Sequence, residues 1–297
     1  MIILKSQIRK RHRAGYLFVL PASIVVLLVN IYPLLRGFYL SFTNSNALYP
    51  DRTTFVGFEN IGKVLFEDKE FWSVIGFTFF YAISTVICVY IISLVLALFV
   101  NQPFRGKSVI RALYLLPWVV PSVVAVNSWS WILNDQFGFI NTTLMQLGLI
   151  QEPILFLATP LAAQLTSVLV GTWKNFPFMM MVLIGAMQAI SPDLYESAHI
   201  DGASAFQRFR YITMPMIKQV SVVSTVLMMI WNFNNFDIVY LLTKGGPGRA
   251  TMNISIYTYN MAFYRQLLGY ASAIAVVMMV IMFIMSYVYR RLLRDKD

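Results

Sequence analysis

Charged side chains are scarce in this chain: Asp, Glu, Lys and Arg make up 12% of its 297 residues. A soluble globular domain carries roughly 25% charged residues, whereas 58% of this chain is hydrophobic. Such a composition is typical of a protein that lies in a lipid bilayer. The net charge of +10 reflects an excess of basic residues, and in a membrane protein such residues mark the loops that face the cytoplasm. We therefore do not expect nucleic acid as a partner.

Cysteine and histidine are almost absent. The one cysteine, Cys88, lies in an apolar run, so it forms no intrachain disulfide and leaves no cysteine cluster for a metal. The two histidines, His12 and His199, show no metal spacing, and no Ser or Cys stands beside a plausible base. A phosphate-binding G-x-x-x-x-G-K-[ST] loop is also missing. We therefore expect no catalytic residue, no metal site and no cofactor bound by this chain.

Long apolar runs, in contrast, are abundant. About 20 apolar residues are needed to cross a bilayer core as a helix. Six segments reach that length, which predicts an all-α membrane protein with six transmembrane helices. They lie near Gly15–Leu35, Phe71–Val100, Val109–Leu133, Pro160–Ile190, Ile217–Leu242 and Ala271–Tyr289.

Lysine and arginine are distributed unevenly between the connections. They gather in the two tails and in the second and fourth connections, whereas the third connection, residues 134–159, contains none. Basic loops stay in the cytoplasm, so both termini are predicted there. We divide the chain into a cytoplasmic N-terminal tail (1–14), a membrane domain (15–290) that contains a cytoplasmic loop (191–216), and a C-terminal tail (291–297).

Proline and glycine mark irregular positions within this plan. Pro117 and Pro121 are expected to bend the third segment, and neighbouring helices must then satisfy the freed carbonyls. The stretch TKGGPGRAT (Thr243–Thr251) predicts a turn. The third connection has apolar residues at helical spacing, which favours a surface helix there.

A polar island, LYESAHIDGASAFQRFRYITMPMIK (Leu194–Lys218), interrupts the apolar sequence. Ser191 and Pro192 are typical of a helix start, with a hydroxyl cap and a proline in the first turn. We expect a helix to His199, a turn at Gly202, and a second helix from Ala203 to about Thr213, ending before Pro215. The pattern alone is equally compatible with a solvated amphipathic loop.

The letters of this island resemble the Glu-Ala-Ala loop of the membrane subunits of ABC importers, with Ser197 where the family usually has Ala. The runs YLFVLPASIVVLLVNIYPLLRGFYLSF and FDIVYLLTKGGPGRAT are similar to carbohydrate-type permeases of that group, most of all to the larger permease subunits of maltose importers. The resemblance covers nearly the whole chain. It assigns contact with an ATPase to Glu196, Ser197, Ala198, Asp201, Gly202 and Ala203.

The resemblance implies a type I ABC importer permease fold with a cytoplasmic coupling helix, in the bacterial inner (plasma) membrane. It implies a second, homologous permease as the partner in a heterodimer, two cytoplasmic ATP-binding subunits that hold ATP and magnesium, and an extracytoplasmic solute-binding protein. The substrate would be a sugar or oligosaccharide, moved by alternating access. Nothing in the sequence identifies the sugar.

Two predicted helices carry polar faces inside the membrane, where polar side chains are costly unless they face a cavity or each other. At about 100° per residue, Asp237 is expected to point away from the face that Met228, Trp231, Asn232 and Asn235 form. Each face combines aromatic surface with amides, which suits sugar rings and hydroxyls. The two faces comprise Gly171, Lys174, Asn175 and Phe178, and Met228, Trp231, Asn232 and Asn235.

The resemblance also implies that these eight positions line the sugar site midway across the membrane. The alternative is that the amides bond between helices. Lys174 is a candidate ligand for the carboxylate of an acidic sugar, although basic residues at this position also occur in relatives that carry neutral sugars. Two other functions remain open: an ion-coupled carrier with Lys174 and Asp237 as relay groups, and an ABC importer permease for a solute that is not a sugar.

Overall fold

The computed structural model describes residues 18–294, so the N-terminal tail (1–14), residues 15–17 and residues 295–297 lie outside the described part. Within it, the regular elements are helices, apart from one isolated antiparallel bridge between Thr43 and Phe55. Five helices are long and apolar enough to cross a membrane, or six if one sharply bent pair counts as a single span. The predicted all-α membrane fold is confirmed.

The chain divides into two compact units. The first comprises Met1–Asp68 and Thr258–Ile281, and the second comprises Lys69–Tyr257 and Met282–Asp297. Helices α13 (Ile254–Tyr259) and α14 (Leu268–Arg294) contribute residues to both units, whereas η5 (Asn260–Tyr264) belongs to the first.

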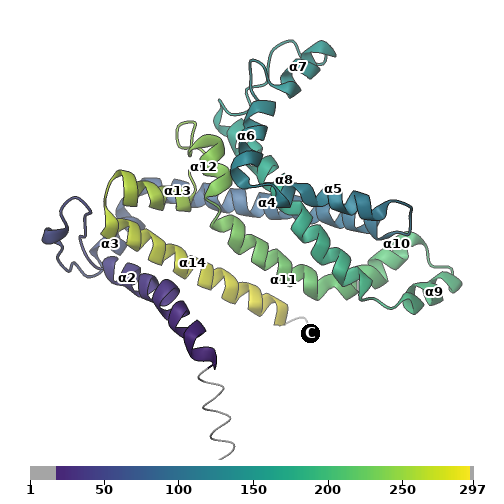
Figure 1. The fold of residues 1–297 in the computed structure, drawn as a ribbon, viewed down its shortest axis with the longest axis horizontal. Helices are drawn as coiled ribbons and strands as arrows, with labels where there is room; N and C mark the ends of the chain where they lie inside the picture. The colour runs from purple at the N-terminus through teal and green to yellow at the C-terminus, as the bar shows by residue number, and fades with distance from the viewer. Residues whose placement is uncertain (1–17, 295–297) are drawn as a thin grey trace, which may run out of the picture. The chain divides into compact units, whose positions relative to one another are not determined.

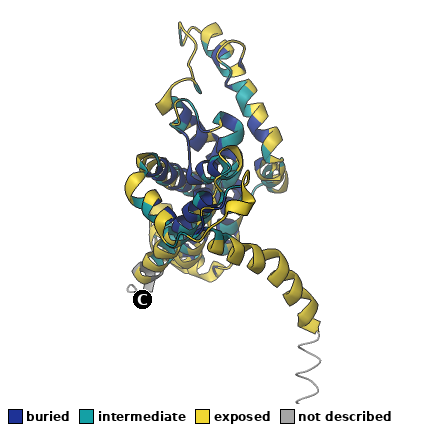
Figure 2. Cartoon of the chain, turned by 90° about the vertical axis from the view of Figure 1, so that its left-hand side faces the viewer, coloured by how far each residue is buried: buried dark blue, intermediate teal, exposed yellow. Residues whose placement is uncertain are grey.

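The first unit begins with the span Phe18–Leu40, which contains the π-helical turn η1 (Leu27–Ile31) and α2 (Tyr32–Leu40). None of its most apolar window is buried within the chain, and Figure 2 shows this helix coloured as exposed. Because its surface is mostly apolar, lipid or another protein must cover it in the membrane.

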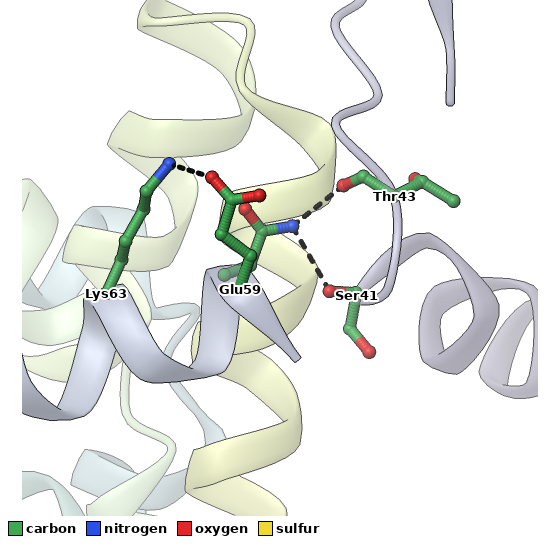
Figure 3. Close-up of polar contacts among 5 residues, drawn as sticks. Ser41, Thr43, Glu59 and Lys63 are labelled. Carbon is green, nitrogen blue, oxygen red and sulfur yellow. Dashed lines mark hydrogen bonds and ion pairs between the residues drawn. The ribbon is translucent and has the colours of Figure 1, made fainter. Parts of the chain in front are cut away.

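The loop after this span contains η2 (Pro50–Arg52), α3 (Glu59–Gly62) and η3 (Lys63–Glu67). A buried amide holds it together, since Asn60 Nδ2 donates to the carbonyls of Ser41 (3.2 Å) and Thr43 (2.7 Å) (Figure 3). On the surface, Lys63 Nζ lies 2.6 Å from Glu59 Oε1. This hydrogen bond and the charge of Glu59 raise the pKa of Lys63.

The second unit is built on α4 (Lys69–Asn101) and α8 (Pro160–Gln188), which lie side by side (Figure 1). Helix α11 (Met214–Phe233) packs against both. Small and flexible apolar side chains fill the space between the three helices, which allows close approach of their backbones. The fully buried members of this core are Val89, Ala97, Val100, Met179, Met180, Leu183, Ile217 and Met228.

The third predicted segment is a broken span. It consists of α5 (Lys107–Val119) and α6 (Ser122–Ile132), which meet at an angle of 95°. Val120 and Pro121 are extended between them, because the residue before a proline avoids the helical conformation. The bend that we expected at Pro121 is confirmed, but Pro117 lies inside α5 without ending it.

The fifth segment differs from its prediction at both ends. Helices α10 (Ala205–Arg208) and α11 join through the π-helical turn η4 (Phe209–Thr213) into one unbroken helix, Ala205–Phe233. The expected stop before Pro215 is wrong, because Pro215 lies in the first turn of α11 and the wider η4 ring, closed by Met214 N–H on Phe209 O, precedes it. At the other end α11 stops at Phe233, and α12 (Asp237–Thr243) is separate.

Shorter elements occupy the connections. Helix α7 (Phe139–Gln146) confirms the surface helix expected in the third connection. The predicted turn after Thr243 is also confirmed, with positive φ angles at Lys244, Gly245, Gly248 and Arg249. Arg249 forms an ion pair with Glu70 at the start of α4, which ties this turn to the helical core.

Candidate functional site

A hollow of about 510 Å³ lies where three irregular or polar segments meet. Its walls come from the break between α5 and α6, from the middle of α8, and from the break between α11 and α12. Membrane-embedded binding sites are commonly formed by such discontinuous helices, because their free backbone groups need polar partners. The lining residues used below are Trp118, Ser122, Lys174, Asn175, Asn234, Asn235 and Asp237.

Lys174 reaches from α8 to the end of α5. Its Nζ donates to the carbonyl oxygens of Pro117 (2.9 Å), Trp118 (3.2 Å) and Val120. The last carbonyls of a helix have no partner within that helix, and Pro121 has no N–H to offer. The ammonium therefore satisfies the carbonyls that the break frees, as we expected of a neighbouring helix.

The asparagines around the hollow are held by backbone groups. Asn175 Nδ2 donates to Gly171 O (2.9 Å), and Asn234 Nδ2 donates to Ile230 O (2.9 Å). Asn235 is arranged in the opposite sense, because its Oδ1 accepts from Ile238 N (3.2 Å) in the first turn of α12. These bonds fix the orientation of each amide and decide which of its atoms remain for a ligand.

An aromatic row stands beside the hollow. The ring of Phe178 lies 6.1 Å from that of Trp118 and 5.0 Å from that of Trp231, measured between centroids. Trp231 is 48% exposed, so part of its indole face is free. A stacking surface next to amide groups is the combination that favours sugar rings.

Five of the eight sequence-predicted site residues do not line this hollow. Phe178 and Trp231 belong to the aromatic row, and the other three face the helical core. Met228 is fully buried, and Asn232 is 1% exposed and donates to Met228 O within its own helix. Gly171 lies against α4, where a Cβ atom would come within 2.6 Å of the Tyr81 hydroxyl. The helical spacing placed all eight on two polar faces, but only Lys174, Asn175 and Asn235 line the hollow itself.

Asp237 corrects a further expectation. We expected it to point away, yet it lines the same hollow as Lys174. The direction predicted for Asp237 from 100° per residue is wrong, because α11 ends at Phe233 and the chain turns before α12 starts. Ser122 and Asn234 also line the hollow and were missed as site residues. The proline at 121 was the available signal for Ser122, since a helix break inside a membrane exposes polar groups.

The loop of residues 191–216 forms the helix–turn–helix that the sequence predicted. Helix α9 (Pro192–Ile200) is followed by Gly202 at φ +79°, and Ala203 N–H closes the turn on Ala198 O (2.9 Å). Ser191 makes no side-chain cap, contrary to expectation, whereas Ser204 and Gln207 form a capping box at the start of α10.

Most of this loop is exposed, and it encloses a second hollow of about 320 Å³. Four of the six residues assigned to ATPase contact line that hollow, namely Ala198, Asp201, Gly202 and Ala203. Glu196 and Ser197 are exposed on α9. The hydroxyl of Tyr195 lies 3.0 Å from Thr213 Oγ1, so α9 is anchored to the helix that continues into α11.

Comparisons with known proteins agree on the kind of molecule. Residues 89–296 match the family model described as "Binding-protein-dependent transport system inner membrane component". The chain is 37% identical over 290 residues, or 96% of each chain, to the trehalose/maltose transport system permease protein MalF of Thermococcus litoralis. It is 34% identical, over 95% of this chain and 90% of the relative, to the sulfoquinovosyl glycerol transport system permease protein SmoG of Agrobacterium fabrum.

A solved structure shows the same fold. The chain matches one chain of a bacterial ABC transporter involved in the import of the acidic polysaccharide alginate, with a TM-score of 0.82 and 24% identity. The match covers 98% of this chain and 99% of the other. At that identity the similarity establishes the arrangement of the helices and leaves the ligand open.

Proposed function

Because the chain belongs to the family of binding-protein-dependent transport system inner membrane components, we propose that it is a permease subunit of an ATP-driven importer for a sugar or oligosaccharide. What carries this proposal is the similarity along the whole chain to a trehalose/maltose permease, with 96% of both chains aligned. The hollow between broken helices, with amides and aromatic rings around it, is suited to such a ligand.

The proposed assembly has three kinds of partner. A second, homologous permease completes the membrane pore, and two copies of an ATP-binding subunit dock on the cytoplasmic loop between Ser191 and Met216. A solute-binding protein delivers the sugar from outside. The loop presents apolar side chains for docking, since Leu194, Ile200, Phe206 and Tyr211 are all exposed and such groups mark interaction surfaces.

The chain lies in the inner membrane, as its family description states. We place both termini and the loop with α9 on the cytoplasmic side, which follows from the distribution of Lys and Arg. ATP and magnesium belong to the partner ATPase. This chain contributes the path for the sugar and the surface through which ATP hydrolysis acts.

In this mechanism, closure of the two ATPases moves α9 and α10, and the helices around the hollow rearrange so that it faces outward. ATP hydrolysis then returns the hollow to the cytoplasm, where the sugar leaves. Aromatic stacking at Trp231 and hydrogen bonds from amides position the sugar in the hollow. Bonding between helices stays the alternative for the buried Asn232.

The proposal is tested by reconstituting the chain in liposomes with its partner permease, the ATPase and the solute-binding protein. We expect uptake of labelled sugar only when ATP, magnesium and all four components are present. Uptake driven by an ion gradient without the ATPase would support the ion-coupled carrier instead. ATP-driven uptake of a solute that is not a sugar would support the assignment as an importer subunit and contradict the assignment of a sugar as its substrate.

A further inference from the structure

We propose that the hollow selects neutral sugars over acidic ones, because Lys174 is occupied as a clamp on the broken span and Asp237 supplies the charge that a ligand meets. This inference rests on the proposed function and adds the chemical class of the substrate. It reverses the role expected for Lys174 from the sequence, where an ammonium in a membrane helix suggested a partner for a carboxylate.

Lys174 has no donor left for a ligand. A lysine ammonium has three N–H groups and no acceptor, and three carbonyls, those of Pro117, Trp118 and Val120, accept from it. A sugar carboxylate could bind only by displacing one of them. The displaced carbonyl would then be left without a partner at the end of α5, which costs free energy inside a membrane.

Two amide oxygens remain for a ligand around the hollow, among the hydrogen bonds found in residues 18–294. Asn175 donates one N–H of its Nδ2 to Gly171 O, and Asn234 donates from its Nδ2 to Ile230 O and Met282 Sδ, so the Oδ1 atom of each is left as an acceptor. Asn235 gives its Oδ1 to a backbone N–H and retains its Nδ2. Free carbonyl oxygens accept from sugar hydroxyls but cannot bind a carboxylate.

Asp237 is the carboxylate in the lining of the hollow. Its side chain is exposed at the start of α12, and within residues 18–294 no hydrogen bond or ion pair to it is found. The carboxylate is therefore free to accept hydroxyl donors, and it repels a second carboxylate at short range. Together with the free oxygens of Asn175 and Asn234, it makes a surface suited to neutral polyols.

The clamp also explains why a charged residue is placed at position 174. The two halves of the span meet at 95°, and the lysine joins α8 to the end of α5 and to the extended residue Val120 that leads into the break, by bonds to Trp118 and Val120. Lys174 is therefore a positioning residue, which holds the wall formed by Trp118 and Ser122 in place. Its loss should disturb neutral and acidic ligands alike.

The experiment measures sugar binding to the assembled permease–ATPase complex in nanodiscs without the binding protein, which would impose its own selectivity. Saturation-transfer NMR titrations compare a glucose tetrasaccharide with a uronic acid tetrasaccharide. We expect the neutral sugar to bind at least about tenfold more tightly, the size of effect that one unscreened like charge produces. Asp237→Asn should narrow that ratio by improving binding of the uronate.

Lys174→Met should weaken both sugars by the same factor, and Lys174→Arg should restore part of the loss. Lys218→Met, at an exposed lysine on α11, is the matched control and should change neither. The inference would be overturned if the uronate bound more tightly than the neutral sugar and Lys174→Met abolished binding of the uronate alone. It would also be overturned if a complex that transports one of the two sugars bound neither of them. A complex that transports no sugar at all would instead refute the proposed function.

Discussion

Trp231 and Asn232 are neighbours in the chain but occupy opposite environments. The indole is 48% exposed and contacts the ring of Phe178, whereas the amide is 1% exposed and faces the core. Asn232 Nδ2 donates to Met228 O, but its Oδ1 is buried without a hydrogen-bond partner among residues 18–294. One residue therefore offers a surface to a ligand, and the other bears the cost of an unpaired polar atom.

Replacing Trp231 with alanine should reduce sugar uptake by about 5- to 150-fold, since a lost contact of this kind costs about 1–3 kcal/mol. Basal ATPase activity and assembly of the complex should not change. Trp131→Ala is the control, because Trp131 is more exposed and its ring contacts that of Phe137, outside the proposed site. Normal uptake by Trp231→Ala would remove the indole from the sugar site.

Asn232→Leu should leave the unfolding temperature unchanged or raise it, because the substitution removes a buried oxygen without a partner. Asn235→Leu is the matched change and should lower stability by about 1 kcal/mol, since the side chain that caps α12 is lost. Thermal unfolding of the detergent-solubilised complex measures both. A large loss in Asn232→Leu would mean that its amide has a partner in the assembly.

At the scale of elements, the turn between α9 and α10 depends on one backbone conformation. Gly202 has φ +79°, and a Cβ atom there would meet nothing within 4 Å. A substitution is therefore strained by the backbone conformation and not by a clash. Asparagine tolerates positive φ better than other residues, and β-branched residues tolerate it poorly.

Gly202→Val should uncouple ATP hydrolysis from transport, whereas Gly202→Asn should retain most of it. The control is Gly106→Val, because Gly106 has φ +88° and equally open surroundings at the start of α5. Uptake and ATPase activity are measured on the same preparation. If both valine variants lose transport equally, the effect is general backbone strain and the loop has no special role in coupling.

The sequence predicted elements well where a helix runs unbroken and poorly where it breaks. The apolar runs of α4 and α8 were placed within two residues at each end, because a membrane requires long apolar helices. Asp237 was misplaced, since periodicity carries no information across the break at Asn234–Phe236. Gly171 does not line the hollow for another reason: its polar neighbours suggested a cavity, but tertiary packing against Tyr81 decides its environment.

At the scale of the whole molecule, the orientation of the chain in the membrane follows from its basic residues. In a background of Cys88→Ala, Ile200→Cys on α9 should react with a membrane-impermeant maleimide only from the cytoplasmic side. Phe137→Cys, near α7, should react only from the outside. Both side chains are exposed, so access is not limited by packing. Labelling of both positions from one side would contradict the predicted topology.

The unbroken helix from Ala205 to Phe233 has a mechanical consequence. Its 29 residues correspond to a rod of about 43 Å at 1.5 Å per residue, and Pro215 lies within it without breaking it. One end follows directly from the turn at Gly202, and the other ends beside Asn234 in the wall of the hollow. A tilt of about 5° about one end would displace the other end by about 4 Å. The helix can therefore act as a lever arm, through which a small movement at the ATPase changes the width of the sugar path.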